Sequence, residues 1–337
     1  MKVKKIALTT ITVIVSLVLI LSCIVYFLFI RLPVVQSKYI IDKNQIKTKI
    51  RETDGMVMVY IPAGEFEMGY HGFWWEKYYW RLNYHDDETP KHKVYLDAYW
   101  MDQTEVTVAM FRKFVEATGY QTTAEREGWG KPWISGPYEE EWNRVEGVDW
   151  QHPLGPNSHA EDNHPVCQVS WEDAAAYCEW AGAKLPTEAQ WEKAARGTDG
   201  RIYPWGNQFD GNLLNFCDLQ SPTRRSHYTD YDDGYAIFAP VGSYPDGASP
   251  YGILDMAGNL WEWVHDWYDA DYYQNSPYKN PSGPKNGEEK AMRGGSWYDL
   301  TWVLCVLRHQ NPVTDRYSDV GFRCAVPIKK GDDKSIE

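Results

Sequence analysis

The sequence predicts a mixed α+β domain with few helices, short strands and much irregular structure, preceded by one transmembrane helix. Three observations lead to this fold class. Helical periodicity with capping residues is found only before Gly197, turn residues dominate after it, and residues 6–30 are apolar and uncharged. Runs of alternating apolar residues supply the strands. This mixture in one chain is typical of α+β architecture.

Residues 6–30 form an apolar run long enough to cross a bilayer, for which about 20 residues suffice. Lysines at positions 2, 4 and 5 precede it, and positive flanks stay in the cytoplasm. We therefore expect a cytoplasmic tip at 1–5 and a single-pass membrane protein whose C-terminal domain is periplasmic or extracellular. The alternative is a cleaved lipoprotein-type signal with Cys23 as the lipid-bearing residue. Because the apolar run continues past Cys23, an uncleaved anchor is favoured.

The remaining chain divides by composition into three parts. Residues 31–55 are charged and poorly periodic, as expected for a stalk, residues 56–328 should form the folded domain, and residues 329–337 should be a flexible tail. The net charge of −13 argues against nucleic acid or anionic lipid head groups as main partners. An acidic surface also suits calcium.

Within the domain, residues 56–69 predict two strands around a Pro-Ala-Gly turn, and residues 92–106 predict another strand. Thr107 should cap a helix over 108–118 that Gly119 ends. Ser170 should cap a second helix over 171–183. Thr187 and Gln190 should form the capping box of a third helix over 188–197.

Two further features of composition leave alternatives open. Residues 70–84 (YHGFWWEKYYWRLNY) hold many aromatic side chains, which predict either a stacking surface for a sugar or peptide or simple burial. Cysteines 167, 178, 217, 305 and 324 are odd in number, so they cannot all pair within the chain. One or two disulfides and at least one other thiol are expected outside the cytoplasm. No C-x-x-C or Cys/His spacing indicates zinc.

The stretch YGILDMAGNLWEWVHDW, residues 251–267, is too polar for a core strand and too aromatic for a solvated loop. Asp255 and Glu262 offer hard carboxylate oxygens, and Gly258 lets the backbone turn its carbonyls inward. This ligand set is the one that Ca²⁺ prefers. We expect a buried calcium loop held by tryptophans 261, 263 and 267. A turn with two exposed acids is the alternative.

A second set of oxygen donors comes from Asn215-Phe216 and from Asp233-Gly234-Tyr235. A carboxamide, a carboxylate and backbone carbonyls could close another cage around Ca²⁺. Acidic turns of this composition are also commonly just solvated, so this indication is weaker than the first.

Several segments in order carry a resemblance to a known family. They are IPAGEFEMG, DQTEVTVAMFRKFVEATGY, HPVCQVSWEDAAAYCEWAGAKLPTEAQWEKAARG, YPWGN, GNLWEW, RGGSW and GFRCA. Together they resemble the formylglycine-generating enzyme, or sulfatase-modifying factor, family from about Met56 to Val326. The resemblance implies one compact domain of the C-type-lectin-like class, poor in regular structure and stiffened by two calcium ions.

The resemblance also implies roles for individual residues. One calcium site would use Asp255, the carbonyls of Gly258 and Leu260, and Glu262; the other would use Asn215, the carbonyl of Phe216, Asp233 and the carbonyl of Tyr235. Cys178 and Cys324 match positions that form a disulfide in the family. Cys305 matches another disulfide cysteine whose partner position is Ala195 here, so it is either free or paired with Cys167 or Cys217.

The departure from the family lies at the copper site. The enzyme binds Cu(I), which thiolates select, through a cysteine pair after the RGGS motif. By matching, Asp299 and Leu304 stand at these two positions, and Cys305 lies one place beyond. Copper is therefore not expected, and neither is oxidase chemistry. Other members of the superfamily hold iron through histidines and a carboxylate in a preceding helical domain. Iron is not expected here, because no such domain fits between Ile30 and Met56 and no H-x-x-x-H-x-E pattern occurs.

The candidates for a ligand groove around this altered site are Trp261, Arg293, Trp297 and Arg308. The two arginines could clamp a carboxylate or sulfate. Equally, the arginines could tie loops together through carbonyls. Candidate catalytic residues are Ser296, Asp299 and His309, the last two as an acid–base pair if they meet. A lone histidine such as His265 or His309 is more commonly structural.

Three functions are consistent with these features. The first is a binding or accessory protein whose groove recognises a peptide, protein or glycan outside the membrane. The second is an enzyme of the superfamily that modifies a peptide or a peptide-derived substrate by oxidoreductase-like chemistry. The third is a variable lectin-like display protein with diversified residues at 297–320.

Overall fold

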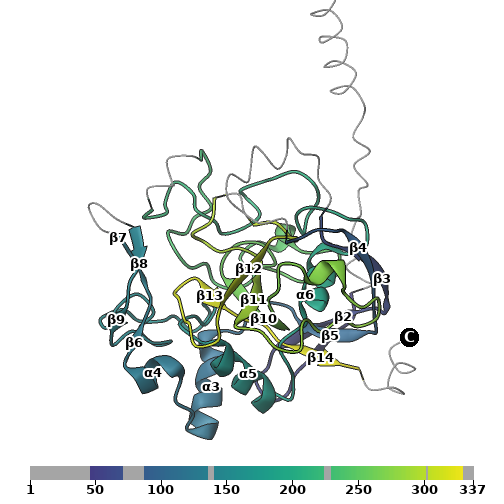
Figure 1. The fold of residues 1–337 in the computed structure, drawn as a ribbon. Helices are drawn as coiled ribbons and strands as arrows, with labels where there is room; N and C mark the ends of the chain where they lie inside the picture. The colour runs from purple at the N-terminus through teal and green to yellow at the C-terminus, as the bar shows by residue number, and fades with distance from the viewer. Residues whose placement is uncertain (1–45, 71–86, 136–139, 224–228, 301–302, 329–337) are drawn as a thin grey trace, which may run out of the picture. The chain divides into compact units, whose positions relative to one another are not determined.

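The computed structural model describes residues 46–70, 87–135, 140–223, 229–300 and 303–328, and it confirms a mixed fold with few helices (Figure 1). The helices are α3 (Val108–Thr118), α4 (Thr123–Glu127), α5 (Trp171–Trp180) and α6 (Glu188–Arg196), with 3-10 turns η2 (Pro245–Gly247) and η3 (Tyr272–Gln274). The strands are β1 (Thr48–Ile50), β2 (Val57–Ile61), β3 (Gly64–Met68), β4 (His92–Leu96), β5 (Tyr99–Asp102), β6 (Trp129–Gly130), β7 (Trp133–Ser135), β8 (Glu140–Trp142), β9 (Val145–Glu146), β10 (Trp261–Trp267), β11 (Glu289–Arg293), β12 (Arg308–Pro312), β13 (Val320–Gly321) and β14 (Ala325–Pro327).

Two four-stranded sheets carry the longer strands. One has the order β1-β2-β5-β14 and the other the order β12-β11-β10-β13. Strands β10 and β13 are parallel, with Trp261 opposite Val320 and Glu262 opposite Gly321, whereas the other neighbours in both sheets are antiparallel. The pairs β3-β4, β6-β9 and β7-β8 form small ribbons. The pairing of β10 with β13 brings the two C-terminal motifs GNLWEW and GFRCA together.

The helices begin at the residues that the sequence indicates. Thr107 accepts a hydrogen bond from Met110 N at the start of α3, which Gly119 ends in the left-handed conformation. Ser170 and Thr187 form capping boxes at α5 and α6. The short helix α4, with a capping box at Thr122, is an addition that the sequence analysis missed.

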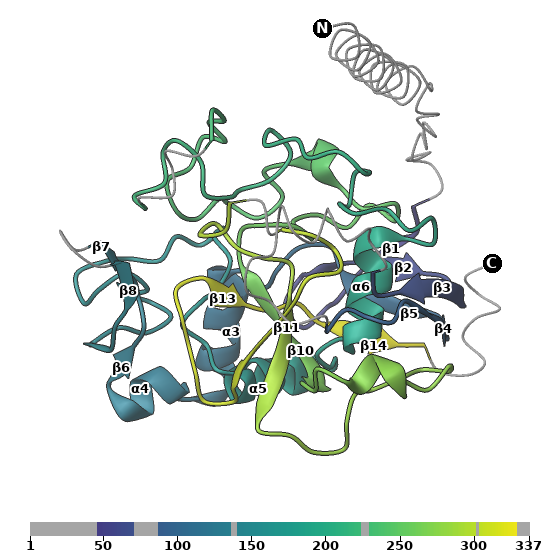
Figure 2. The same cartoon turned by 45° about the horizontal axis from the view of Figure 1, so that its top comes forward.

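Helix α6 occupies a central place in the domain. It packs against β3 and β4 on one side and against β10 and β11 on another, and Figure 2 shows it beside the strands of the N-terminal sheet. All of its residues except Gln190 are buried, including the charged side chains of Glu188, Glu192 and Arg196. Buried charges need partners. Glu188 and Glu192 bind arginines of β11 and β12, whereas Arg196 binds Glu192 and backbone carbonyls outside those strands.

The predicted stalk is too long at its C-terminal end. Residues 48–50 form β1, which pairs with β2. Arg51 is buried, and its guanidinium binds Asp54 at 2.6 Å and Asp102 at 2.7 Å. Tyr177 Oη donates to the same Asp54 carboxylate at 2.6 Å. Residues 46–55 are therefore part of the folded domain, because β1 pairs with β2 and the charged side chains of Arg51 and Asp54 are buried and paired.

Other parts of the predicted organisation lie outside the described residues. These are the cytoplasmic tip, the apolar run at 6–30, the tail and all but the first residue of the aromatic segment 70–84. Among the residues that the structure does describe, no helix is long and apolar enough to span a bilayer.

Candidate functional site

The stretch 251–267 is largely buried, but the expectation that it is too polar for a core strand is wrong for its second half, because Trp261–Trp267 forms the mostly buried strand β10. Glu262 is 1% exposed and Asp255 is 9% exposed, so they are not the exposed acids of the alternative interpretation. Asp255 has a φ of 56° and accepts a hydrogen bond from Gly242 N at 2.6 Å. Gly258 has a φ of 77°, and a Cβ atom there would lie 2.1 Å from the carbonyl oxygen of Asn215. Only glycine fits this close approach between the two predicted calcium loops.

A buried arginine, Arg323, balances part of the negative charge of this loop. Its Nε and Nη2 atoms each donate to Glu262 at 2.7 Å, and Nη2 also donates to the carbonyl of Leu254 at 3.0 Å. Glu262 accepts a further hydrogen bond from Trp191 Nε1 at 2.8 Å. Arg323 was not among the predicted site residues, although it stands in the GFRCA motif.

A third carboxyl group, Glu105, completes this buried cluster. It is 0% exposed, and its Oε2 atom has no hydrogen-bond partner among the described residues. Burial, together with the nearby Asp255 carboxyl, raises the pKa of Glu105 well above its usual range. Burial also raises the pKa of Asp255. If Glu105, Asp255 and Glu262 are all ionised, they carry two negative charges more than the single guanidinium of Arg323 can balance.

The second predicted loop has a similar unsatisfied oxygen. Asn215 is 1% exposed, and its Oδ1 atom has no partner in the described part of the chain. Asp233 accepts hydrogen bonds from the backbone N–H groups of Phe216 and Tyr235, both at 2.9 Å. Burial raises the pKa of Asp233 to about 7. The four predicted residues are therefore brought together by the fold.

Asn259 joins the two loops, and the sequence analysis did not single it out. Its Oδ1 atom accepts from Asn215 Nδ2 at 2.9 Å, and its Nδ2 atom donates to Glu105 Oε1 at 2.9 Å. Its place inside the GNLWEW motif was the available signal. The unsatisfied oxygens of Asn215 and Glu105 are hard donors of the kind that Ca²⁺ prefers, whereas both oxygens of Glu262 are already bound by Arg323.

The copper positions of the family hold no thiolate pair. Asp299 lies in a turn after β11, where its Oδ2 atom accepts from Ser296 N at 3.0 Å and from Ser296 Oγ at 3.1 Å. Leu304 packs against the hydrophobic clusters. Cys305 is 0% exposed, and burial raises the pKa of its thiol to about 12. Cys305 is therefore a neutral buried thiol rather than a thiolate.

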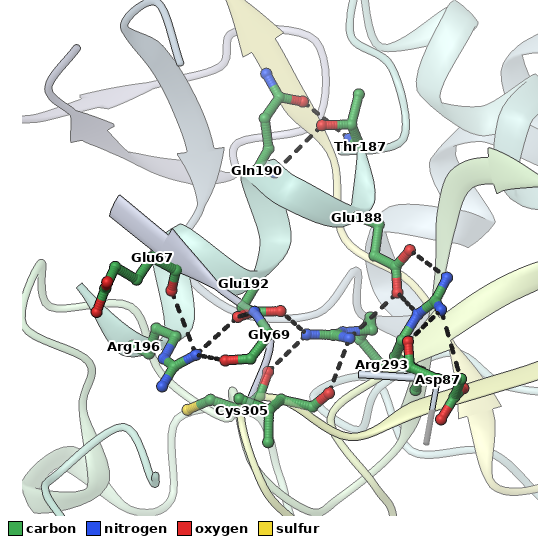
Figure 3. Close-up of polar contacts among 12 residues, drawn as sticks. Glu67, Gly69, Asp87, Thr187, Glu188, Gln190, Glu192, Arg196, Arg293 and Cys305 are labelled. Atoms are coloured by element: carbon green, nitrogen blue, oxygen red, sulfur yellow. Dashed lines mark hydrogen bonds and ion pairs between the residues drawn. The ribbon is translucent and has the colours of Figure 1, made fainter. Parts of the chain in front are cut away.

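The two arginines predicted to line a ligand groove are buried in the structure. Arg293 is 0% exposed and Arg308 is 2% exposed, and both neutralise buried acids of α6; Figure 3 shows Arg293 between Glu188 and Glu192. Arg293 binds Glu192 at 2.6 Å, while Arg308 binds Glu188 at 2.7 Å. Arg293 also donates to the carbonyls of Cys305 and Val306, at 2.7 and 3.1 Å. The alternative interpretation, in which the arginines tie loops together, describes them correctly.

The aromatic groove candidates and His309 are also largely enclosed. Trp297 is 1% exposed and packs edge-on against the rings of Trp133 and Trp142. Trp261 is 6% exposed, and its ring lies 5.2 Å from that of His309. Burial lowers the pKa of His309. Asp299 contacts Ser296, whereas His309 packs against Trp261. These contacts do not indicate an acid–base pair of Asp299 and His309.

The predicted disulfide cysteines are neighbours in the fold. Cys178 on α5 and Cys324 before β14 are both buried, and their sulfur atoms lie 2.8 Å apart as thiols. Cys324 N donates to Asp102 at 3.0 Å, which places the pair directly beside the Arg51 ion cluster.

Comparison with known proteins identifies the family. Residues 43–328 match the model of the sulfatase-modifying factor enzyme 1-like domain. The chain is 38% identical over 303 residues to the formylglycine-generating enzyme of Streptomyces coelicolor, covering 82% of this chain and 90% of that protein. It is 33% identical over 289 residues to the inactive C-alpha-formylglycine-generating enzyme 2 of Mus musculus, covering 80% and 85%.

A solved structure agrees with this assignment at the level of the fold. PvdO from Pseudomonas aeruginosa superposes with a TM-score of 0.63 at 23% identity, covering 84% of this chain and 98% of PvdO. The order of motifs, the paired oxygen-rich loops and the sequence matches lead to one conclusion: the chain belongs to the sulfatase-modifying factor family, as a divergent member.

Proposed function

We propose that the chain is a membrane-anchored, extracytoplasmic binding or accessory domain that keeps the calcium-stabilised, C-type-lectin-like scaffold without copper-dependent oxidase chemistry. The observation that carries this proposal is the Asp299 turn. A carboxylate held by Ser296 and a half-buried leucine replace two soft sulfur ligands, and Cu(I) selects thiolates over such groups. The similarity to a relative named as inactive supports the same function.

Two calcium ions are part of this proposal. One would be held by Asn215, Asp233 and the carbonyls of Phe216 and Tyr235, and the other by Asp255, Glu262 and the carbonyls of Gly258 and Leu260. Support comes from the unsatisfied Asn215 Oδ1 and from the excess negative charge around Arg323. A divalent cation would offset that charge without protonating the carboxyls.

The oxidase activity can be tested directly on the full-length chain supplied with Cu(I) and oxygen. A peptide with the sulfatase-type C-x-P-x-R sequence should keep its cysteine unchanged in mass spectrometry. The Streptomyces coelicolor enzyme, treated in parallel, serves as the positive control. Formylglycine in the peptide exposed to this chain would overturn the proposal.

We further propose that Cys178 and Cys324 form a disulfide in an oxidising compartment, as their adjacent sulfurs support. Alkylating the denatured, full-length chain should then modify two more cysteines after reduction than before it. In the Cys178→Ser variant, Cys324 should become reactive without reductant. Equal labelling of the wild-type chain with and without reductant would show that the two cysteines remain thiols.

The runner-up function is an enzyme that modifies a peptide or peptide-derived substrate with another chemistry. One observation favours it: the Ser296 hydroxyl contacts both the half-buried carboxylate of Asp299 and a second acid, Asp319. Substituting Asp299 by asparagine should abolish such an activity while calcium binding and folding are retained. An activity that survives this substitution would rule out a role for Asp299 in that enzyme.

A further inference from the structure

Two carboxyl groups converge on one serine hydroxyl at the altered copper position. Ser296 Oγ lies 3.1 Å from Asp299 Oδ2 and 3.3 Å from Asp319 Oδ2. The same oxygen accepts a hydrogen bond from Tyr298 N at 3.2 Å. Asp299 Oδ2 also accepts from Ser296 N at 3.0 Å. Asp299 is half-buried, whereas Asp319 is 7% exposed.

Two full hydrogen bonds between this serine and the two carboxyl groups require one more proton than two ionised carboxylates provide. A hydroxyl has one hydrogen to donate and two lone pairs that accept. If Ser296 Oγ donates to Asp299, its lone pairs remain for the Tyr298 N–H group and one other donor. Asp319 can be that donor only as a carboxylic acid. With both acids ionised, the two carboxylates would have to share the single hydroxyl hydrogen, and each contact would be weaker than a full hydrogen bond.

The surroundings indicate which acid holds the proton. Asp299 is more exposed and accepts a backbone N–H group, and both conditions favour the ionised form. Burial, and then the nearby charge of Asp299, raise the pKa of Asp319 to about 8. Among the described residues, the other titratable groups that interact with Asp319 are the thiol of Cys167 and the phenol of Tyr317, and burial raises the pKa of both.

We propose that Asp319 is held as a neutral carboxylic acid that donates to Ser296, which in turn donates to ionised Asp299, so that a single retained proton keeps the 296–299 turn closed. We call this arrangement the proton latch. It stands where the family places its first copper thiolate, and it depends neither on calcium nor on the proposed binding function. Loss of the proton places two negative charges on one hydroxyl group, which opens the turn.

The turn connects to other parts of the site, so opening it has consequences. The carbonyl of Asp299 accepts from Cys217 N at 2.9 Å, next to the Asn215 loop. Trp297 and Tyr298, within the turn, pack on Trp133 and Trp142. The proton latch therefore makes the position of these aromatic rings sensitive to pH.

The Asp319→Asn variant tests the latch, because an amide donates to Ser296 at every pH. The pKa of Asp319 in the folded state is about 8, above the unfolded value of about 3.9. A raised pKa of an acid means that the folded state binds the proton more tightly, so wild-type stability is highest at low pH and falls as pH rises through this window. The unfolding constant of the wild type, divided by that of Asp319→Asn, should rise by up to about tenfold per pH unit and level off above pH 8.

Urea unfolding of the full-length chains at constant calcium concentration measures this ratio. Asp230→Asn, at an exposed acid, is the matched control and should give a ratio that does not change with pH. Asp299→Asn removes the negative charge next to Asp319, so the unfolding constant of this variant should level off at a lower pH than that of the wild type. This comparison tests the latch even if Asp319→Asn fails to fold. A pH-independent ratio for Asp319→Asn, or no shift with Asp299→Asn, would refute the latch.

Discussion

Replacing Arg323 with alanine should lower the free energy of unfolding by about 3–5 kcal/mol, the range expected when one partner of a buried ion pair is removed. Arg323 is 0% exposed and binds both oxygens of Glu262. The substitution leaves Glu105, Asp255 and Glu262 without their nearest positive charge. It also removes hydrogen bonds to the carbonyls of Leu254 and Gln103, at 3.0 and 3.2 Å. Chemical denaturation at fixed calcium and pH measures the loss.

Two further variants separate the causes of this loss. Arg323→Lys keeps the charge but cannot form the two-pronged contact with Glu262, so its stability should fall between that of the wild type and of the alanine variant. Arg112→Ala removes a comparable pair at the surface, where Arg112 is 37% and Asp162 is 70% exposed. Exposed pairs contribute about 0–1 kcal/mol. If Arg323→Ala were no more harmful than Arg112→Ala, the charge balance described for this loop would be wrong.

Removing calcium should destabilise the folded chain by about 2.7 kcal/mol for each site that was held at a hundred times its dissociation constant. Thermal or urea unfolding with and without a calcium chelator measures this change. Magnesium should not restore the loss, because it is smaller and demands stricter octahedral geometry. A chelator that leaves the unfolding curve unchanged would contradict the proposed calcium sites.

A pair of matched variants assigns the calcium effect to one loop. Asp233→Asn should reduce the stabilisation by calcium, because Asp233 is the carboxylate of the Asn215 loop. Asp230→Asn, in the same loop but exposed, should respond to calcium as the wild type does. If the two variants responded equally to calcium, Asp233 would not be a ligand of the ion. Elemental analysis of the purified chain for calcium, copper and iron gives an independent count.

Features that depend on neighbours along the chain could be predicted from the sequence. The caps at Thr107, Ser170 and Thr187 each bond to a residue three positions later, so the local pattern contains both partners. The meeting of Asn215 with Asp233, and of Cys178 with Cys324, needed the resemblance to the family. Spacing alone left both open.

Features that depend on distant partners could not be predicted. Arg293 and Arg308 lie far along the chain from Glu188 and Glu192, and an arginine in a motif looks the same whether it binds a ligand or a buried acid. Arg51 was assigned to a stalk for the same reason. Asn259 and Glu105 lie inside motifs of the family, but their roles could not be predicted because they arise from contacts between separate loops.

The ion cluster of Arg51 determines how the domain resists mechanical load. Any pull on the N-terminal residues reaches the three-residue strand β1 first and then arrives at Arg51, whose guanidinium binds two carboxylates inside the protein. Three residues of edge strand peel away under little force, whereas extracting Arg51 exposes Asp54 and Asp102 as uncompensated buried charges. We therefore expect a pull on the N-terminal residues to meet its main resistance at Arg51 rather than in β1.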